Sequence, residues 1–377
     1  MIKRILLNRI IHKFKTSQKV IVLYGARQTG KTTFARQVIK ETKYKTLSIN
    51  ADIGKYNNIL SSRNLEKLKH LTNGYELLFI DEAQRIQDIG INLKILSDEI
   101  PELKILVTGS SSLDIAQNIS ESLTGRKQVY YLYPFSLEEI KLDKTNFELE
   151  QQFEEQMIFG LYPEVYLSKN IDEKIDLLTE ITSSYLYKDV LELANIKHPR
   201  KLNDLLRLLA FQIGSEVAIN ELSRSLKINQ ETVERYLDLL EKSFVIFRLS
   251  GFSKNLRKEI RKRDKFYFYD LGVRNTIIEN YNYLNKRNDV GGLWENFVII
   301  ERLKFLDFNK IRANTFFWRT YTGAELDYIE ETNGLLNGYE IKYNKIKLKA
   351  PKTWIDTYEN ATFKGISKTN FLDFVLT

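Results

Sequence analysis

The stretch Gly25-Ala-Arg-Gln-Thr-Gly-Lys-Thr32 decides the fold of the first part of this chain. It fits the phosphate-binding pattern G-x-x-x-x-G-K-[ST] at every fixed position. The preceding run, Lys19–Tyr24, is largely apolar and short enough for a buried strand, and the following run, Thr33–Lys40, has the pattern of a helix. A strand, a glycine loop and a helix in this order are the context that the pattern requires.

Each fixed position of the loop has a chemical reason. Gly25 and Gly30 let the backbone turn tightly, so that successive N–H groups and the positive end of the following helix point at one anion. Lys31 is expected to reach the β- and γ-phosphates, and the Thr32 hydroxyl is expected to ligate Mg²⁺. The predicted ligands are therefore ATP and Mg²⁺. The residues predicted to contact the nucleotide are Gly25, Ala26, Arg27, Gln28, Thr29, Gly30, Lys31, Thr32 and Thr33.

The composition indicates a globular protein of several domains. The chain has 377 residues, of which 43% are hydrophobic and 28% charged. It contains no cysteine, which excludes disulfides and thiolate metal sites. The net charge of +8 permits nucleic acid or an anionic surface as a partner and selects neither.

Two features of the sequence predict a cytoplasmic protein without a membrane partner. No apolar run approaches the roughly 20 residues that span a bilayer, and residues 1–9 carry too many charges for a signal peptide. The absence of cysteine also suits a reducing compartment.

Two adjacent acids close the next strong feature, Glu76–Gln84. Its four apolar residues indicate a strand buried on both faces. Two carboxylates at a buried strand end repel each other unless a cation lies beside them. We therefore expect Asp81 to hold Mg²⁺, directly or through water, and Glu82 to position and deprotonate the attacking water. The alternative is an ordinary acidic junction between a strand and a loop, which the upstream phosphate loop makes less favoured.

Two further residues have open assignments. Thr108 lies where the apolar run of Leu103–Ser110 stops, so its hydroxyl can contact the γ-phosphate or the attacking water. The alternative for this segment is a serine-rich turn that caps the next helix. Arg126 can stabilise charge on the transferring phosphoryl group, within its own subunit or on a neighbour in a homo-oligomer. A surface salt bridge explains Arg126 equally well.

Together these motifs resemble the AAA+ superfamily, and more closely the prokaryotic ATPases that carry a C-terminal domain of unknown function called DUF4143. The resemblance covers nearly the whole chain. It rests on Gly25–Thr32, Leu77–Gln84, Thr108–Ser111, Ser122–Arg126, Tyr133–Glu139, Gly160–Val165 and Glu340–Lys342. It implies an ATP-binding α/β domain, a helical lid, a winged-helix segment and a nuclease-like end, without a known biological task.

The middle of the chain is helical in composition. Residues 136–198 are expected to form a lid and linker. Over 199–252, three short helices and a strand fit a winged helix-turn-helix. The third of these helices carries mainly acidic residues, which is the wrong sign for contact with DNA phosphates. Protein docking or domain packing is therefore at least as favoured as base reading.

Basic residues gather just after this segment. The run 254–265 holds seven basic residues against two acidic ones. If it forms the tip of a wing, it would neutralise several DNA phosphates and make binding strongly salt-dependent. A solvated hairpin tip is the alternative.

Two neighbouring strand candidates near the end of the chain carry an acid and an acid-x-lysine. With a glutamate on a preceding helix, this set resembles the PD-(D/E)xK nucleases. The resemblance implies that Asp327, Glu340 and Glu295 hold Mg²⁺ beside a scissile phosphate and that Lys342 orients or activates water. The same fold also occurs in inactive, structural forms.

We therefore predict an α/β protein with a P-loop AAA+ ATPase domain and a helical lid, followed by a winged helix and an α/β restriction-endonuclease-like domain. The predicted boundaries are 1–135 for the ATPase domain, 136–198 for the lid and linker, 199–252 for the winged helix-turn-helix and 253–377 for the nuclease-like domain. Two functions stay open. One is an ATP-hydrolysing protein coupled to a DNA-binding and DNA-cleaving C-terminal domain. The other is an ATP-driven switch whose C-terminal domain cuts nothing and binds a protein partner.

Overall fold

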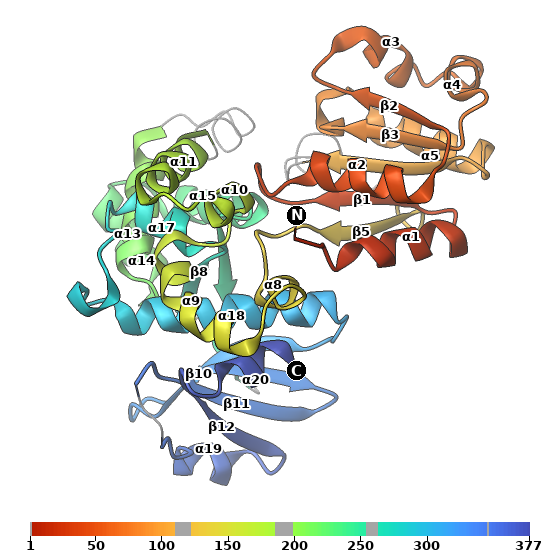
Figure 1. The fold of residues 1–377 in the computed structure, drawn as a ribbon. Coiled ribbons are helices and arrows are strands. Elements are labelled where there is room, and N and C mark those ends of the chain that lie inside the picture. The colour runs from red at the N-terminus through yellow and green to blue at the C-terminus, as the bar shows by residue number, and fades with distance from the viewer. Residues whose placement is uncertain (1, 110–121, 185–198, 254–262, 345–346) are drawn as a thin grey trace. The chain divides into compact units, whose positions relative to one another are not determined.

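The computed structural model describes residues 2–109, 122–184, 199–253, 263–344 and 347–377. The chain divides into two compact units, which Figure 1 draws as a ribbon. The first unit is built mainly from Met1–Tyr133. The second is built from Pro134–Thr182, Ile196–Glu241 and Val245–Thr377.

A parallel five-stranded sheet forms the centre of the first unit (Figure 1). Its strands are β1 (Val20–Tyr24), β2 (Thr46–Asn50), β3 (Leu77–Asp81), β4 (Lys104–Gly109) and β5 (Lys127–Tyr131). The helices around it are α1 (Leu6–Thr16), α2 (Lys31–Thr42), α3 (Asn57–Leu60), α4 (Leu65–Thr72) and α5 (Ile89–Glu99), with the short 3₁₀ turns η1 (Gly54–Tyr56) and η2 (Ala83–Arg85). Every residue of β1 and β3 is buried, as expected for apolar parallel strands that are covered on both faces.

The order of the strands positions the site. The sheet runs β2-β3-β4-β1-β5, so β1 has β4 on one side and β5 on the other, and β3 follows β4. All these pairs are parallel, which places the carboxyl ends of β1, β4 and β3 next to one another at one edge. Open parallel sheets bind their ligands at that edge.

The second unit begins with helices and contains a small antiparallel sheet. Its first helices are α8 (Leu137–Lys141), α9 (Asn146–Phe159), α10 (Pro163–Leu167) and α11 (Ile171–Ser184). They are followed by α13 (Pro199–Phe211), β6 (Glu216–Val217), α14 (Ile219–Leu226), α15 (Gln230–Lys242), β7 (Ile246–Leu249) and β8 (Asp264–Phe268). The three strands pair antiparallel in the order β6-β8-β7. Hence β8, which the sequence analysis assigned to the domain at 253–377, belongs to the sheet of the preceding helices.

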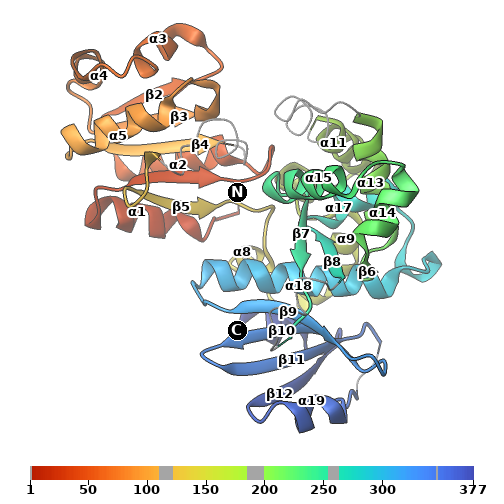
Figure 2. The same cartoon turned by 180° about the vertical axis from the view of Figure 1, so that it is seen from behind.

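A four-stranded sheet forms the last part of the second unit (Figure 2). The chain passes through α17 (Leu271–Ile277), the turn η4 (Leu284–Lys286), α18 (Val290–Phe308), β9 (Asn314–Arg319), β10 (Glu325–Thr332), β11 (Leu335–Ile341), α19 (Lys352–Thr357), β12 (Ala361–Ile366) and α20 (Phe371–Leu376). The sheet order is β12-β11-β10-β9, antiparallel except that β12 lies parallel to β11. Of the helices described, none is both long and apolar enough to cross a lipid bilayer.

Hydrogen bonds join the two sheets of the second unit. The N–H of Phe252 donates to the carbonyl of Phe317 at 2.6 Å, and the N–H of Phe317 donates to the carbonyl of Ser250 at 3.0 Å. The segment after β7 therefore pairs with β9. The helix α18 also connects the two parts of the second unit. It packs against α9 and β8 of the helical part and against β11 and α20 of the C-terminal part.

Candidate functional site

The phosphate loop connects β1 to α2 at the middle of the parallel sheet. At Gly25, directly after β1, a Cβ atom would lie 2.3 Å from the carbonyl oxygen of Leu132, which only glycine avoids. Gly30 has a φ of +87°, in the left-handed region, and α2 begins at the next residue. Both fixed glycines of the motif thus have a backbone reason to be glycine.

The loop folds around the ammonium group of Lys31. This side chain is buried and donates hydrogen bonds to the carbonyl oxygens of Gly25 at 2.9 Å and Ala26 at 2.8 Å. The hydroxyl of Thr29 also donates to the carbonyl of Ala26, at 2.9 Å. Of the nine residues predicted to contact nucleotide, Gly25, Ala26, Thr29 and Lys31 are buried, Arg27, Gly30 and Thr32 are half-buried, and Gln28 and Thr33 are exposed.

Asp81 receives two hydroxyl donors at the end of β3. The hydroxyl of Thr32, in the first turn of α2, donates to its Oδ2 at 2.8 Å. The hydroxyl of Thr108, which is fully buried in β4, donates to its Oδ1. The strand order β3-β4-β1 explains the meeting, because Thr108 lies on the strand between Asp81 and the loop. We call these three residues the hydroxyl–carboxylate triad.

Glu82 follows Asp81 directly in the sequence and takes part in two hydrogen bonds. Its backbone has a φ of 52° and turns the chain out of β3. Its N–H donates to the Thr108 hydroxyl at 3.2 Å, and the side-chain amide of Gln84 donates to its carboxylate. The structure thus brings together Thr32, Asp81, Glu82 and Thr108 at the carboxyl edge of the sheet. The serine-rich turn predicted after Thr108 lies outside the described residues.

Sequence reasoning missed Arg4 as a support of the loop. Arg4 is buried, and its guanidinium donates to the carbonyl of Thr29 at 2.6 Å and to that of Tyr133 at 3.1 Å. These partners lie far away along the chain, so no local pattern could have found them. Arg4 therefore fastens the loop to the segment that leaves β5.

Arg126 lies at the opposite end of the sheet from the phosphate loop of its own chain. Its carbonyl accepts from the N–H of Val20 at 2.9 Å, where β1 begins, whereas the loop follows Tyr24 at the other end of that strand. Its Nε lies 2.5 Å from Oδ1 of Asp98, and both side chains are about 40% exposed (41% and 37%). The structure thus gives Arg126 the surface salt bridge and argues against a role at the loop of its own subunit.

The four residues of the predicted nuclease site also meet, within the second unit. Lys342 lies 2.9 Å from Asp327 Oδ2 and 2.9 Å from Glu340 Oε1. Asp327 is buried, and its Oδ2 also accepts from the N–H of Ile341 at 2.8 Å. Glu295, on α18, joins the set through a fifth residue that sequence reasoning did not assign to this site.

That fifth residue is Lys265 of β8. It is 7% exposed, and its Nζ lies 3.0 Å from Glu295 Oε1 and 3.7 Å from Asp327 Oδ1. Tyr267 also donates to Glu295, at 2.5 Å. One signal in the sequence pointed here: Lys265 directly precedes the apolar run Phe266–Tyr269, and a buried charge needs a partner. We call Lys265, Glu295, Asp327, Glu340 and Lys342 the carboxylate–lysine cluster.

The electrostatics of the cluster favour charged lysines. Burial alone would lower the pKa of Lys265, but Glu295 and Asp327 outweigh it and raise this pKa above its ordinary value. Burial raises the pKa of Glu295 to about 7, against the opposing charge of Lys265. Within the described residues, no three histidine, aspartate or glutamate side chains are arranged to hold a metal ion. That Glu295, Asp327 and Glu340 bind Mg²⁺ therefore stays a prediction, and two ammonium groups lie among these acids.

The basic run predicted to contact DNA falls mostly outside the described residues, at 254–262. Its last member, Lys265, is buried in the cluster, so it is not available to phosphates. On the neighbouring strand β7, Arg248 lies within 3.5 Å of carboxylate oxygens from Glu234, Glu241 and Asp264. This excess of acids agrees with the unfavourable sign expected for the third helix.

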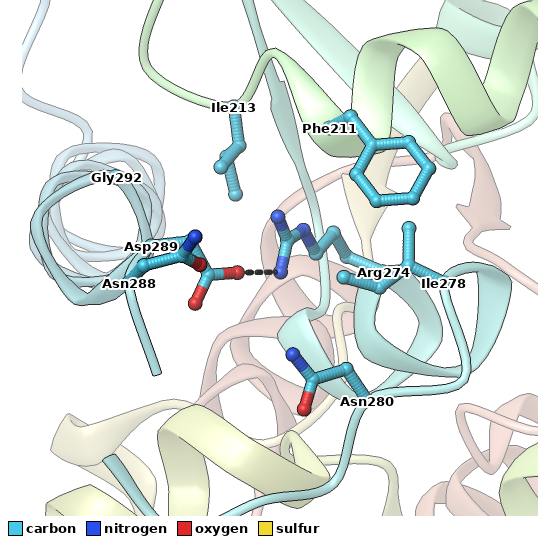
Figure 3. A pocket seen from close by; sticks show the side chains of 8 residues that line it. All are labelled: Phe211, Ile213, Arg274, Ile278, Asn280, Asn288, Asp289 and Gly292. Carbon is cyan, nitrogen blue, oxygen red and sulfur yellow. Dashed lines mark hydrogen bonds and ion pairs between the residues drawn. The ribbon is translucent and has the colours of Figure 1, made fainter. Parts of the chain in front are cut away.

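A cavity of about 410 Å³ lies elsewhere in the second unit, between α13, α17 and the start of α18 (Figure 3). Arg274, a positively charged residue in the cavity lining, is buried and makes hydrogen bonds within the fold. The guanidinium donates to Asp289 Oδ2 at 2.5 Å and twice to the carbonyl of Ala210, at 2.5 and 2.9 Å. Arg287 also donates to both oxygens of Asp289, at 2.8 Å. We therefore assign no ligand to this cavity.

Three family models match successive parts of the chain. Residues 17–141 match the model described as an AAA domain. Residues 150–283 match a domain of unknown function, DUF8612, and residues 290–369 match the domain of unknown function DUF4143. The first match contains the phosphate loop and the triad, and the last contains Glu295 and the four-stranded sheet.

Relatives extend along most of the chain. An uncharacterized protein of Mycobacterium tuberculosis is 28% identical over 339 residues, which cover 89% of this chain and 72% of that protein. An uncharacterized protein of Methanocaldococcus jannaschii is 25% identical over 394 residues, covering 96% of this chain and 87% of that protein.

One solved structure has a comparable fold. The Walker-type ATPase of Pyrococcus abyssi matches with a TM-score of 0.50 at 16% identity, over 74% of this chain and 96% of that chain. At this identity the likeness shows the fold alone. Combined with the matched families, it agrees with the loop and the parallel sheet described above. The chain therefore has the domain organisation of an AAA-type ATPase with a C-terminal DUF4143 domain.

Proposed function

We propose that this protein binds ATP with Mg²⁺ at the loop Gly25–Thr32 and hydrolyses it. The observation that carries the proposal is the hydroxyl–carboxylate triad, in which Thr32 donates to Asp81 at 2.8 Å beside a phosphate loop. The two hydroxyl partners of Asp81 are neutral and bring no positive charge of their own, so they leave a place for a cation beside this carboxylate. The same hydroxyl and carboxylate are the oxygen ligands that Mg²⁺ prefers.

The residues of the loop have separable roles in this proposal. Lys31 exchanges its contacts with the carbonyls of Gly25 and Ala26 for the β- and γ-phosphates. Thr32 and Asp81 hold Mg²⁺, which when bound neutralises charge on the phosphates. Thr108 keeps the Asp81 carboxylate oriented from the neighbouring strand.

Glu82 is the proposed base. Its backbone is fixed by Thr108 and its carboxylate by the amide of Gln84, so the side chain has a defined position beside the loop. In this role Glu82 orients the attacking water and takes its proton, which contributes about 100-fold or more to the rate.

The test of the proposal is Lys31→Ala, with Lys40→Ala as the matched control. Both lysines lie on α2, but Lys31 is buried in the loop and Lys40 is exposed. We expect phosphate release from ATP to fall to background in Lys31→Ala and to stay unchanged in Lys40→Ala. Hydrolysis at the normal rate in folded Lys31→Ala would rule out this loop as the catalytic site.

A second variant separates binding from turnover. Glu82→Gln keeps the shape and the contact with Gln84 but cannot accept a proton. We expect it to bind a fluorescent ATP analogue as the parent does and to release phosphate about 100-fold more slowly. If Glu82→Gln no longer binds nucleotide, the residue supports the loop structure instead.

The topology of the second unit supports the two folds implied by the family resemblance. Three helices with the antiparallel sheet β6-β8-β7 have the order of a winged helix-turn-helix. A helix, three antiparallel strands, a helix and a parallel strand, from α18 to β12, have the order of the PD-(D/E)xK fold. A fold of this kind does not by itself establish cleavage.

Between the two functions left open by the sequence, we favour the ATP-driven switch. Glu234 and Glu241 of α15, the third helix of the predicted winged helix-turn-helix, lie close to Arg248. Lys265 is buried and is therefore not exposed to phosphates. DNA binding through 254–265 is tested by changing Lys258, Arg261 and Arg263 together to Glu. Loss of duplex binding at physiological salt would restore the DNA-binding function, whereas binding that survives, or that neither protein shows, leaves this run without that role.

A further inference from the structure

We infer that the carboxylate–lysine cluster is closed by a built-in cation, the Lys265 ammonium, so that in this chain it holds no divalent metal ion and cleaves no nucleic acid. The fold family implies Mg²⁺ at this place. The residues present do not fit that ion. The inference does not rest on ATP hydrolysis in the first unit.

The first argument is the position of the ammonium group. Lys265 Nζ lies between Glu295, at 3.0 Å, and Asp327, at 3.7 Å, which are two of the three acids that would share a metal. An ammonium and a divalent cation repel each other, so the metal could enter only if Lys265 left. Lys342 contacts the other oxygen of Asp327 and also Glu340. Two ammonium groups therefore already balance two of the negative charges that three carboxylates can carry.

The second argument is that one oxygen of Asp327 and one oxygen of Glu295 each already accept two hydrogen bonds. Asp327 Oδ2 accepts from the N–H of Ile341 at 2.8 Å and from Lys342 at 2.9 Å. Glu295 Oε1 accepts from Lys265 at 3.0 Å and from the Tyr267 hydroxyl at 2.5 Å. Mg²⁺ requires several oxygens directed at one point, about 2.0–2.1 Å away. Here Asp327 Oδ2 and Glu295 Oε1 are directed at nitrogen and hydroxyl donors instead.

The third argument is that Lys265 cannot leave easily. It belongs to β8, the middle strand of the sheet β6-β8-β7, and is paired on one side with Glu216 and on the other with Leu249. The backbone of Lys265 therefore cannot move away without breaking hydrogen bonds to both neighbouring strands. Lys265 is also 7% exposed, so solvent ions have little access to it.

The cluster therefore has a different role, that of a joint. Lys265 and Tyr267 reach from β8 to α18, and Lys265 also reaches β10 of the four-stranded sheet. Acids that the fold family uses for metal thus hold the helix-turn-helix sheet against the C-terminal domain. The backbone pairing of Phe252 with Phe317 reinforces the same junction.

The experiment measures Mn²⁺ binding by the full chain, with Mn²⁺ as the probe for a divalent cation. Every protein carries Asp81→Asn and no nucleotide is added, so that the first unit contributes no site. The variants added to this background are Lys265→Ala, Lys265→Ala with Asp327→Asn, and Lys364→Ala as a control for loss of an exposed lysine on β12. Free Mn²⁺ is followed by electron paramagnetic resonance.

We expect no Mn²⁺ site in the background protein or in Lys364→Ala. Lys265→Ala should gain one site, which the added Asp327→Asn removes, and Mg²⁺ should raise the melting temperature of Lys265→Ala only. A site in the background protein that Asp327→Asn abolishes would overturn the inference. So would a folded Lys265→Ala protein that gains no site.

Two further measurements keep the inference testable if Lys265→Ala does not fold. The background protein and its Asp327→Asn variant are compared for Mn²⁺ binding, and equal titrations support the built-in cation. Linear, branched and single-stranded DNAs are then incubated with Mg²⁺ and the otherwise unchanged chain, with and without ATP. Cleavage that Asp327→Ala abolishes would overturn the inference even if every ATPase prediction holds.

Discussion

Two buried aspartates, Asp81 and Asp327, lie in two different sheets and have different kinds of partner: neutral hydroxyl groups at Asp81 and charged ammonium groups at Asp327. Asp81 ends β3 of the parallel sheet and accepts from the hydroxyls of Thr32 and Thr108. Asp327 lies in β10 of the C-terminal sheet and faces the ammonium groups of Lys342 and Lys265. Both were predicted from the sequence to hold Mg²⁺, and both are less than a tenth exposed.

The difference between the two aspartates lies in what their partners do to the charge. A hydroxyl satisfies a carboxylate oxygen as a hydrogen-bond donor but leaves its negative charge in place. An ammonium supplies the donor and cancels the charge as well. The first arrangement suits a cation that comes and goes with a nucleotide, whereas the second has its cations permanently in the chain. An acidic residue at the right place is thus insufficient evidence for a metal.

The strongest test of this contrast is the stability of Lys265→Met. Removing the ammonium leaves the buried carboxylate of Glu295 without its cation, which costs about 3–5 kcal/mol of folding free energy. Urea unfolding monitored by tryptophan fluorescence measures the change, with the exposed Lys364→Met as the control. If Lys265→Met unfolds at the same urea concentration as the parent, the cluster is not the joint that we infer.

At Asp81 we expect the opposite balance of effects: a large loss of ATP hydrolysis and a small change of stability. Asp81→Asn should lower ATP hydrolysis by about 100-fold, or about 2.7 kcal/mol of barrier, because the cation loses its carboxylate. Its effect on unfolding should stay within about 1 kcal/mol, because an amide still exchanges hydrogen bonds with the two hydroxyls. Phosphate release and urea unfolding are measured on the same preparations, with the exposed Asp52→Asn as control. Full activity in Asp81→Asn would contradict the role of the triad.

Asp289 offers a third case for this comparison, in which the stability of the fold should depend on pH. Two guanidinium groups bind this carboxylate, and it lies outside both predicted metal sites. Burial would raise its pKa, but the hydrogen bonds from Arg287 and Arg274 outweigh burial and lower the pKa to about 2. A lowered carboxyl pKa stabilises the fold above the ordinary value of 3.8 and loses this contribution as the pH falls toward about 2.

We therefore expect Asp289→Asn to lower the free energy of unfolding by about 2 kcal/mol near neutral pH, with the difference shrinking below about pH 4. The measurement is urea unfolding of parent and variant over that range. A difference that does not change with pH would mean that packing, rather than charge, explains the effect.

The smallest effect is expected at Arg126. Its salt bridge with Asp98 is about 40% exposed, so Arg126→Ala should change stability by about 1 kcal/mol or less. Because this residue lies away from the loop of its own chain, ATP hydrolysis by dilute protein should not change. A loss of hydrolysis that appears only at high protein concentration would indicate that Arg126 acts on a neighbouring subunit.

The sequence predicted the first unit better than the second, for a physical reason. The loop, the buried strands and the acids at their ends are local patterns, and parallel strand order brings their ends to one edge. Arg4 and Lys265 were missed because their contacts join residues far apart in the chain, and a single basic side chain has no period. Lys265 was moreover counted with the basic run 254–265, where composition suggested a solvent-exposed role.

The predicted nuclease-like residues show a second limit of local sequence patterns. Asp327, Glu340 and Lys342 lie in contact, and Lys265 links Glu295 to them. What the pattern could not indicate is which cation accompanies them, because the deciding ammonium comes from β8, in another sheet. A motif specifies the ligands of a site, whereas its occupant depends on the neighbouring fold.

The contact between Gly25 and the carbonyl of Leu132 couples the phosphate loop to the main chain that follows β5. That carbonyl would lie 2.3 Å from a Cβ atom at position 25, and Arg4 also ties the carbonyl of the next residue, Tyr133, to the loop. A side chain introduced at position 25 is therefore expected to displace the backbone where the chain leaves the first unit, and not the loop alone.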